Sequence, residues 1–386
     1  MLNKMTRKEF IPYGRQWIDE DDIRAVVDVL RSDYLTTGPK TAEFEKAFAN
    51  YVGVKYAVAV SNGTAALHAA VFAAGIGPGD EVITTPITFA ASANCVLYMG
   101  GRPVFADIDH DTYNINPQEI RKKITKKTKA IIPVHFTGQP VNLDEIHAIA
   151  REHHLIVIED AAHALGATYQ GKKIGGLSDL TTFSFHPVKH ITTGEGGMIT
   201  TNNPEFYRKL LLFRSHGITR DSSLLGQNDG PWYYEQQLLG YNYRMTDIQA
   251  ALGISQLKKL DQFIQRREEI VRQYNEAFQK LSGLNLPYQL GNTRSSWHLY
   301  IIRVNPGQSL VSRDGLFAGL TERNIGVNVH YIPVYRHPYY QNSGYPNGLC
   351  PEAEEFYARA ISLPLFPKMT DRDVTDVIDT ILDLLK

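Results

Sequence analysis

The sequence predicts an α/β protein, in which a layered α/β domain precedes a smaller α+β unit. Short β-branched or apolar runs alternate with helical stretches through the first two thirds of the chain. Several of these runs are apolar throughout, which is typical of strands covered by helices on both faces. From Thr246 the pattern changes to a long amphipathic helical stretch, which indicates a second unit.

Seven runs are expected to form the strands of the first domain. Helices are expected to fill the intervals, for example at Thr64–Ala74 and Leu143–His153. The expected strands are Tyr56–Val60, Glu81–Thr84, Arg102–Ile108, Ala130–Phe136, Leu155–Asp160, Thr181–Phe185 and Met198–Thr200.

The last third of the chain predicts a helix long enough to bridge two domains. Its apolar positions recur every three or four residues, with one turn skipped at Arg267. They are Leu257, Leu260, Ile264, Val271, Tyr274, Phe278 and Leu281. Strands are expected at His298–Val304 and Gly326–Ile332, and Thr370 opens a capping box before a final helix. We therefore expect a large domain over residues 1–255 and a small C-terminal domain over residues 256–386.

Composition narrows the functional classes. The 386 residues carry a net charge of −1, so neither nucleic acid nor a membrane is expected as a partner. Two cysteines far apart in sequence, Cys95 and Cys350, fit a reducing compartment and a cytoplasmic location. The 13 histidines show no zinc-binding spacing, so no metal is expected, and the pair His186 and His190 is interpreted as pocket lining.

A candidate phosphate site follows the first expected strand. Ser61-Asn62-Gly63-Thr64 opens an alanine-rich helix, whose free N–H groups and positive dipole end can bind phosphate, with the Thr64 hydroxyl as a further donor. The sequence lacks the lysine of a GxxxxGK[ST] loop, which argues against an NTPase. On this motif alone, an ordinary capped turn is an equally good interpretation.

Two further motifs carry a carboxylate and a lysine. Asp160 ends an apolar run, at the edge where open α/β sheets bind ligands, and it can either pair with a ligand nitrogen or cap the next helix. Lys189 follows an expected strand in a turn rich in hydroxyls and glycines, and a lysine near apolar walls and other cations becomes nucleophilic. A phosphate site, an acid for a ring nitrogen and a Schiff-base lysine are what pyridoxal 5′-phosphate (PLP) requires.

These motifs resemble the sugar aminotransferases of the DegT/DnrJ/EryC1/StrS family over nearly the whole chain. The resemblance implies fold type I of the PLP-dependent transferases, the aspartate aminotransferase fold, with a mixed, mostly parallel sheet in the large domain and a smaller α+β C-terminal domain. The matching segments are LTTGP (35–39), SNGTAAL (61–67), GPGDEVITTPITF (77–89), EDAAHA (159–164), FSFHPVKHITTGEGG (183–197), FRSHG (213–217) and GYNYRMTDIQAALG (240–253).

The resemblance also implies a role for each matching residue around the cofactor ring. Lys189 holds PLP as a Schiff base and then moves protons during transamination. Asp160 pairs with the pyridine nitrogen, and His163 forms a hydrogen bond with the 3-oxygen of the ring. Phe89 stacks on the ring face, although an ordinary role as a core aromatic stays open.

The remaining implied residues hold the phosphate and the substrate. The phosphate ligands are Gly63, Thr64, Ser184 and, from a second subunit, Asn242, which implies a homodimer with shared active sites. The implied sugar-nucleotide pocket contains Tyr13, Leu35, Thr36, Thr37, Gly38, His330, Tyr331, Ile332 and Pro333.

Within the family, VHYIPVY (329–335), FRSHG and ISLPL (361–365) most resemble the transaminases that make UDP-4-amino-4,6-dideoxy-N-acetyl-β-L-altrosamine for pseudaminic acid. The implied reaction moves the amino group of L-glutamate to C4 of a UDP-4-keto-6-deoxy-N-acetylhexosamine. Spore-coat polysaccharide aminotransferases share many of these segments, so another nucleotide-linked keto-sugar, aminated at C4 or C3, stays open. PLP-dependent elimination or racemisation and a non-catalytic PLP-binding regulator also stay open. The intact Lys189 argues against the 3-dehydratase branch, in which histidine replaces this lysine.

Overall fold

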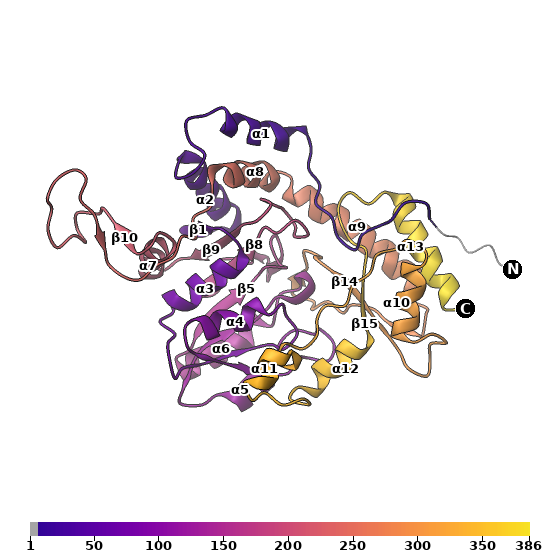
Figure 1. Cartoon of the computed structure of the whole chain (residues 1–386). Helices are drawn as coiled ribbons and strands as arrows, with labels where there is room; N and C mark the ends of the chain where they lie inside the picture. The colour runs from indigo at the N-terminus through magenta and orange to yellow at the C-terminus, as the bar shows by residue number, and fades with distance from the viewer. Residues whose placement is uncertain (1–6) are drawn as a thin grey trace.

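The computed structural model describes residues 7–386 and is built on a seven-stranded sheet in the order β1-β9-β8-β5-β4-β2-β3 (Figure 1). Strand β9 runs antiparallel to both of its neighbours, and the other adjacent pairs are parallel. The strands are β1 (Tyr56–Val60), β2 (Glu81–Thr84), β3 (Arg102–Phe105), β4 (Thr128–Ile132), β5 (Ile156–Asp160), β8 (Leu180–Ser184) and β9 (Gly197–Thr201). The predicted α/β class with a mixed, mostly parallel sheet is confirmed.

Helices cover both faces of this sheet, because successive residues of a strand point to opposite sides. In β1, Ala57 and Ala59 pack into one core, and Val58 and Val60 pack into the other. The first core lies under α2 (Pro39–Val52), α5 (Pro117–Lys123), α6 (Leu143–His153) and α8 (Asp247–Leu257). The second lies under α3 (Gly63–Ala73), α4 (Ala91–Tyr98) and α7 (Pro204–Arg214). Helix α1 (Glu20–Leu30) packs on α8.

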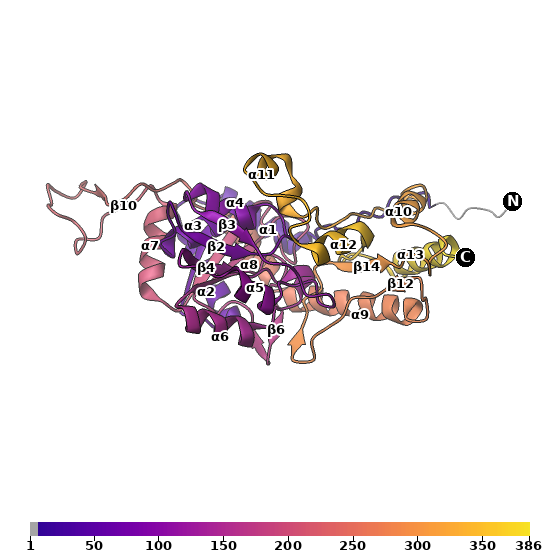
Figure 2. The ribbon, with the colours of Figure 1, turned by 90° about the horizontal axis from the view of Figure 1, so that it is seen from below.

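A smaller antiparallel sheet forms the core of a second unit, which extends from one end of the first (Figure 2). Its strands are β12 (Leu284–Asn285), β14 (Tyr300–Val304) and β15 (Ala360–Leu363), and its helices are α9 (Leu260–Phe278), α10 (Arg313–Thr321) and α13 (Asp371–Leu384). Ile11, from the N-terminal segment, also packs into this core. The division at residues 255 and 256, within the last turn of α8, stays a proposal.

Short elements complete the fold. A hairpin of β10 (Ile218–Thr219) and β11 (Glu235–Gln236) projects from the body beside α7 (Figure 1). A small sheet joins β6 (Thr168–Tyr169) and β7 (Lys172–Lys173) to β13 (Thr293–Arg294). The remaining helices are α11 (Pro338–Asn342), α12 (Pro351–Arg359) and the 3-10 turns η1 (Phe136–Gly138) and η2 (Val334–Arg336). Across residues 7–386, no helix combines the length and the apolar content needed to cross a membrane.

Several predicted boundaries were wrong. The strand expected over Ala130–Phe136 ends at Ile132, because Pro133 has no N–H to donate to the ladder. The strand expected over Arg102–Ile108 ends at Phe105. The segment Gly326–Ile332 is not a strand and makes a single bridge, from Asn328 to Ser362.

The helical stretch expected from Thr246 onwards is divided into two helices, α8 and α9. The break lies at Lys258 and Lys259, and Lys259 turns to bind Asp19 and, at 2.9 Å, Asp22 in α1. Helix α8 packs only into the first core, whereas α9 begins there with Leu260 and Ile264 and continues into the core of the second unit.

The turn that the apolar pattern skipped carries a buried arginine. Arg267 in α9 is only 1% exposed, and its Nη1 donates to the carbonyl oxygens of Trp297 (3.1 Å), His298 (3.2 Å) and Leu365 (2.8 Å). Among residues 7–386 no carboxylate pairs with this guanidinium, and burial lowers its pKa to about 9. Arg267 therefore ties α9 to the segment that precedes β14.

This arrangement predicts that Arg267→Ala lowers the free energy of unfolding by about 3 kcal/mol, because three buried carbonyls lose their donor and a cavity remains. Arg272→Ala is the control on the same helix. Arg272 is exposed and pairs only with Glu276, so its loss should cost no more than about 0.5 kcal/mol. Denaturant unfolding of both variants tests the difference, and equal losses would show that Arg267 is not an anchor.

Candidate active site

The ends of three parallel strands meet at one edge of the large sheet. Gly197, the first residue of β9, pairs with Val60 at the end of β1 and with Ser184 at the end of β8. Asp160, at the end of β5, pairs with Thr182 of β8. The segments that follow these strands carry most of the predicted cofactor residues, so the sheet brings together residues that are far apart in sequence.

The turn between β1 and α3 forms the predicted phosphate cradle. Asn62 caps α3, and its side chain accepts a hydrogen bond from the Ala65 N–H at 2.8 Å. A Cβ atom on Gly63 would lie 2.9 Å from the Cβ of Ser184, so only glycine allows the helix to start this close to β8. The free N–H groups of the first turn and the Ser184 side chain are thus adjacent, which suits a phosphate group.

Asp160 is held in a fixed orientation. It is 4% exposed, and its carboxylate accepts hydrogen bonds from Ser92 Oγ (2.6 Å) and from the Ala162 N–H (3.1 Å). Ser92 in α4 also shares a 2.7 Å hydrogen bond with Thr88. Thr88 and Ser92 were not predicted from the sequence as site residues. Their spacing of four residues, where a helix begins after β2, was a signal that could have indicated them.

Lys189 lies beside Asp160 in a partly buried position. Its own backbone N–H donates to the His186 carbonyl in the turn after β8. Burial lowers the pKa of Lys189 to about 8, and the negative charge of Asp160 opposes this shift only in part. The side chain therefore supplies a neutral, nucleophilic amine at a lower pH than an ordinary lysine does.

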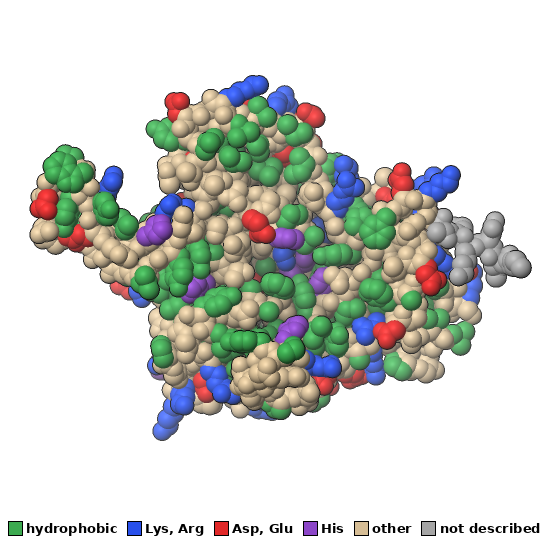
Figure 3. Space-filling view, viewed as in Figure 1, with side chains coloured by type: hydrophobic (Ala, Val, Ile, Leu, Met, Phe, Trp, Pro, Cys, Tyr) green, Lys and Arg blue, Asp and Glu red, His purple; other side chains and the backbone are tan. Residues whose placement is uncertain are grey.

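Four buried histidines lie around Lys189, and histidine side chains gather near the middle of the face drawn in Figure 3. Burial, together with the nearby positive charge of Lys189, lowers the pKa of each of them. The histidines are His163, His190, His298 and His330, and the pKa of His330 falls to about 3. At neutral pH they are uncharged, and so do not repel the lysine.

Aromatic side chains from three separate segments of the chain lie beside these histidines. The Tyr331 hydroxyl is 3.3 Å from Nε2 of His163. The rings of Tyr13 and His330 are 5.4 Å apart, and His330 Nδ1 shares a 2.7 Å hydrogen bond with Ser362. Phe89 is 64% exposed, with its ring 6.5 Å from that of Tyr331, so it is not a core aromatic of this chain. Its proposed place is against the cofactor ring.

The other predicted residues lie outside this cluster within one chain. Residues 35–38 form an exposed loop tied to the start of α8, where Asp247 accepts the Gly38 N–H at 2.6 Å and donates its own N–H to the Leu35 carbonyl at 3.0 Å. Thr36 bridges to Thr246, and Thr37 has a φ of 55°. Asn242 is exposed and bridges to Ser215. Among residues 7–386, no hydrogen bond or ring contact links this loop or Asn242 to Lys189.

Two of the predicted pocket residues, Ile332 and Pro333, follow Tyr331 directly. Ile332 is exposed, whereas Pro333 is buried. Of the histidines that the sequence analysis interpreted as pocket lining, His190 is buried beside Lys189 and His186 is exposed. His298 was missed, because a single polar residue at the start of an apolar strand gives no signal for a function.

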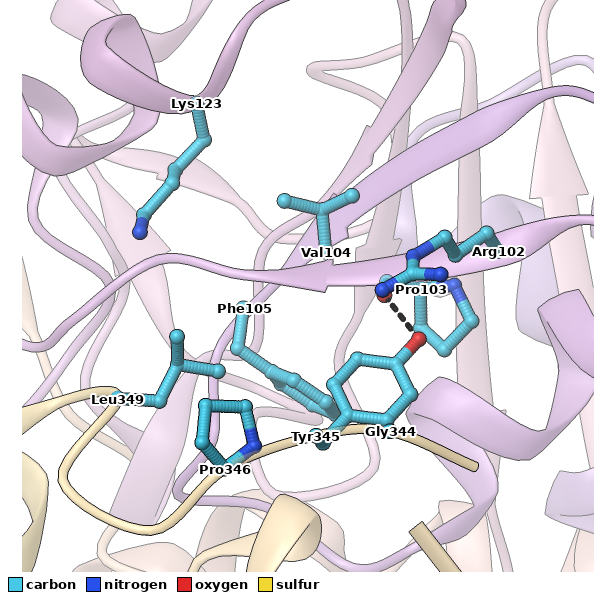
Figure 4. A pocket seen from close by; sticks show the side chains of 9 residues that line it. All are labelled: Arg102, Pro103, Val104, Phe105, Lys123, Gly344, Tyr345, Pro346 and Leu349. Atoms are coloured by element: carbon cyan, nitrogen blue, oxygen red, sulfur yellow. Dashed lines mark hydrogen bonds between the residues drawn. The ribbon is translucent and has the colours of Figure 1, made fainter. Parts of the chain in front are cut away.

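A separate cavity of about 120 Å³ lies beside the edge strand β3 (Figure 4). Arg102 stacks over the Tyr345 ring at 5.1 Å, and the Tyr345 hydroxyl donates to the Pro103 carbonyl at 2.6 Å. None of the residues that line this cavity belongs to the Lys189 cluster. In the part of the chain that the structure describes, no three His, Cys, Asp or Glu side chains are placed to hold a metal ion.

The residues of the cluster fit PLP. The N–H groups at the start of α3 lie beside Ser184 and can bind a phosphate group, and the fixed Asp160 carboxylate can pair with a ring nitrogen. His163 has its Nε2 next to the Tyr331 hydroxyl, where a ring oxygen can be bound. Lys189 provides the amine for a Schiff base with the aldehyde.

The lowered pKa of Lys189 predicts how the cofactor-free protein captures PLP. Only the neutral amine attacks an aldehyde, so the rate should rise with pH and level off above the pKa of about 8. Stopped-flow absorbance at the Schiff-base band measures this rate. A rate that still rises about tenfold per pH unit above about pH 9 would mean that the lysine keeps the ordinary pKa of 10.5.

Comparison with known proteins agrees with this geometry. Residues 16–382 match the model of the DegT/DnrJ/EryC1/StrS aminotransferase family. The spore coat polysaccharide biosynthesis protein SpsC of Bacillus subtilis is 46% identical over 382 residues, which cover 98% of each chain. Helicobacter pylori PseC, an aminotransferase involved in the biosynthesis of pseudoaminic acid, has a TM-score of 0.90 at 34% identity, covering 98% of this chain and 99% of its own.

A third similar protein bears on the cofactor. The putative sugar aminotransferase Spr1654 of Streptococcus pneumoniae, solved in its PLP form, has a TM-score of 0.91 at 35% identity, covering 97% of this chain and 98% of its own. The family model spans most of the chain, and the α/β architecture with its mostly parallel sheet is that of fold type I. This chain belongs to the DegT/DnrJ/EryC1/StrS aminotransferase family and is a PLP-dependent sugar aminotransferase.

Proposed function

We propose that the enzyme moves the amino group of L-glutamate to C4 of UDP-2-acetamido-2,6-dideoxy-β-L-arabino-hex-4-ulose, in the biosynthesis of pseudaminic acid or a related surface polysaccharide. The observation that carries the aminotransferase chemistry is Lys189, partly buried beside Asp160 with its pKa lowered to about 8. The similarity to PseC supports the substrate class. The higher identity to SpsC keeps a second candidate, another nucleotide-linked keto-sugar of a surface polysaccharide.

Each residue of the cluster has a proposed task in this reaction. PLP, when bound, supplies an electron sink that stabilises negative charge next to the transferred nitrogen. Asp160, oriented by Ser92 and Ala162, keeps the ring nitrogen protonated. Lys189 accepts a proton from one substrate and returns it to the other, which a pKa near 8 allows in both directions at neutral pH.

The proposed sugar pocket lies on the side of the cluster that the second unit covers. Tyr13, His330 and Tyr331 provide aromatic faces there, and Ser362 holds the His330 ring. Aromatic walls suit the apolar face of a deoxy sugar, and the tyrosine hydroxyls provide polar contacts at its edge.

We also propose a homodimer in which each active site receives Asn242 from the partner subunit. Asn242 is exposed and is not linked to the Lys189 cluster of its own chain. The β10–β11 hairpin beside it projects from the body (Figure 1), and its segment exposes Trp232 (71%) and Leu239 (78%). Apolar side chains this exposed are typical of a surface that a second subunit covers.

An absorbance experiment on the purified protein tests the proposed reaction. L-glutamate should bleach the Schiff-base band of the PLP-loaded enzyme, and the 4-keto sugar should restore it. Lys189→Arg should lower transamination by at least about 10³-fold, whereas Lys172→Arg, at an exposed lysine, should leave it unchanged.

Other outcomes separate the alternatives. Restoration of the band only by a 3-keto sugar, or by another nucleotide sugar, would keep the aminotransferase and replace the substrate. A dehydrated sugar as product would indicate elimination. Comparable turnover by Lys189→Arg would contradict the role of Lys189.

A further inference from the structure

Three uncharged imidazoles form a row that ends at His163. The rings of His163 and His298 are 4.2 Å apart and those of His298 and His190 are 5.6 Å apart. All three side chains are buried, and the Nδ1 atom of each is buried without a hydrogen-bond partner. His190 Nε2 donates to the Ser296 carbonyl at 3.1 Å.

The unpartnered Nδ1 atoms indicate which nitrogen carries the proton. A buried N–H without an acceptor costs more than a buried lone pair without a donor, so the proton belongs on the nitrogen that has a partner. For His163 that nitrogen is Nε2, which faces the Tyr331 hydroxyl. In this tautomer His163 can donate to a ring oxygen, as its proposed role requires.

Hydrogen bonds fix the backbone on both sides of His298. Arg267 donates to the carbonyls of Trp297 and His298, and the Leu299 N–H donates to the Thr137 carbonyl at 3.2 Å. A Cβ on Gly138 would lie 2.9 Å from both the His298 nitrogen and the His163 oxygen. The second unit therefore packs the His298 ring against the His163 ring.

We propose that His298 is a positioning residue for His163. Its ring packs on the His163 imidazole without offering a hydrogen bond to Nδ1, and so holds Nε2–H towards Tyr331 and the cofactor ring. This inference rests on the proposed role of His163 at the 3-oxygen of PLP. Neither His298 nor the Arg267 anchor touches the substrate or the cofactor in this account.

Two substitutions separate the ring contact from simple folding. His298→Phe keeps a ring that cannot bond to Nδ1, whereas His298→Asn removes the ring and offers an amide oxygen that can accept a hydrogen bond from Nδ1–H and so draw the proton away from Nε2. A donor to the 3-oxygen stabilises the form with more negative charge on that oxygen, so its loss raises the pH at which the PLP band titrates. We expect His298→Asn to raise this midpoint by about one unit and to weaken PLP binding about tenfold, with little change for His298→Phe.

A double-mutant cycle with His163→Phe provides the decisive comparison, because it reports whether one residue acts through the other. His298→Asn should shift the midpoint in the wild-type background and have no effect on it in the His163→Phe background. His68→Phe, at a buried histidine on α3, is the control that should not move the midpoint. His298→Gln replaces the Asn variant if that variant does not fold.

The proposal is overturned if Asn and Phe at position 298 shift the midpoint equally, or if the Asn shift persists without His163. If the wild-type protein forms a Lys189-dependent band but the variants give either of these results, only the role of His298 is contradicted. A wild-type protein without a Lys189-dependent band contradicts the proposed function as well.

Discussion

The placement of β9 between β1 and β8 is the constraint on which the active site depends. Gly197 pairs with Val60 on one side and with Ser184 on the other, which places the start of α3 against the lysine-bearing loop. A Cβ on Gly197 would lie 2.4 Å from the Asn62 oxygen, so this register requires glycine at the crossing. The parallel pairing of β8 with β5 then adds Asp160. The cradle, the acid and the amine are therefore set by backbone hydrogen bonds.

The second unit completes the site from the other side. Arg267 fixes the segment before β14, and that segment places His298 on His163, while Tyr331 and His330 cover the same group of imidazoles. Burial lowers the pKa of these histidines and the positive charge of Lys189 adds to the shift, so they stay uncharged at neutral pH. A lysine with a lowered pKa is the result of the same burial. Burial of these side chains where the two units pack together thus accounts for the lowered pKa values of both the histidines and Lys189.

Much of this organisation was predictable from the sequence. All seven strands of the large sheet were expected, because buried strands leave continuous apolar runs, and Asp160 and Lys189 were proposed as site residues from their places at the end of such a run and shortly after one. Contacts between distant segments had no comparable signal. Ser92, His298 and Arg267 act through partners far away in the chain, and Arg267 was visible only as a gap in an apolar stripe. The strand expected at 326–332 does not form. An apolar run in the sequence does not reveal that, within this segment, Asn328 alone forms a bridge to a neighbouring strand.

We propose that Lys189, at the edge of the large sheet, is the lysine of this chain that binds PLP. Reduction of the PLP-loaded protein with borohydride fixes the Schiff base as a stable amine, and peptide mapping by mass spectrometry then locates it. We expect a single labelled peptide that contains Lys189, with labelling abolished in Lys189→Arg. A label on a different lysine, or one that persists in Lys189→Arg, would contradict it.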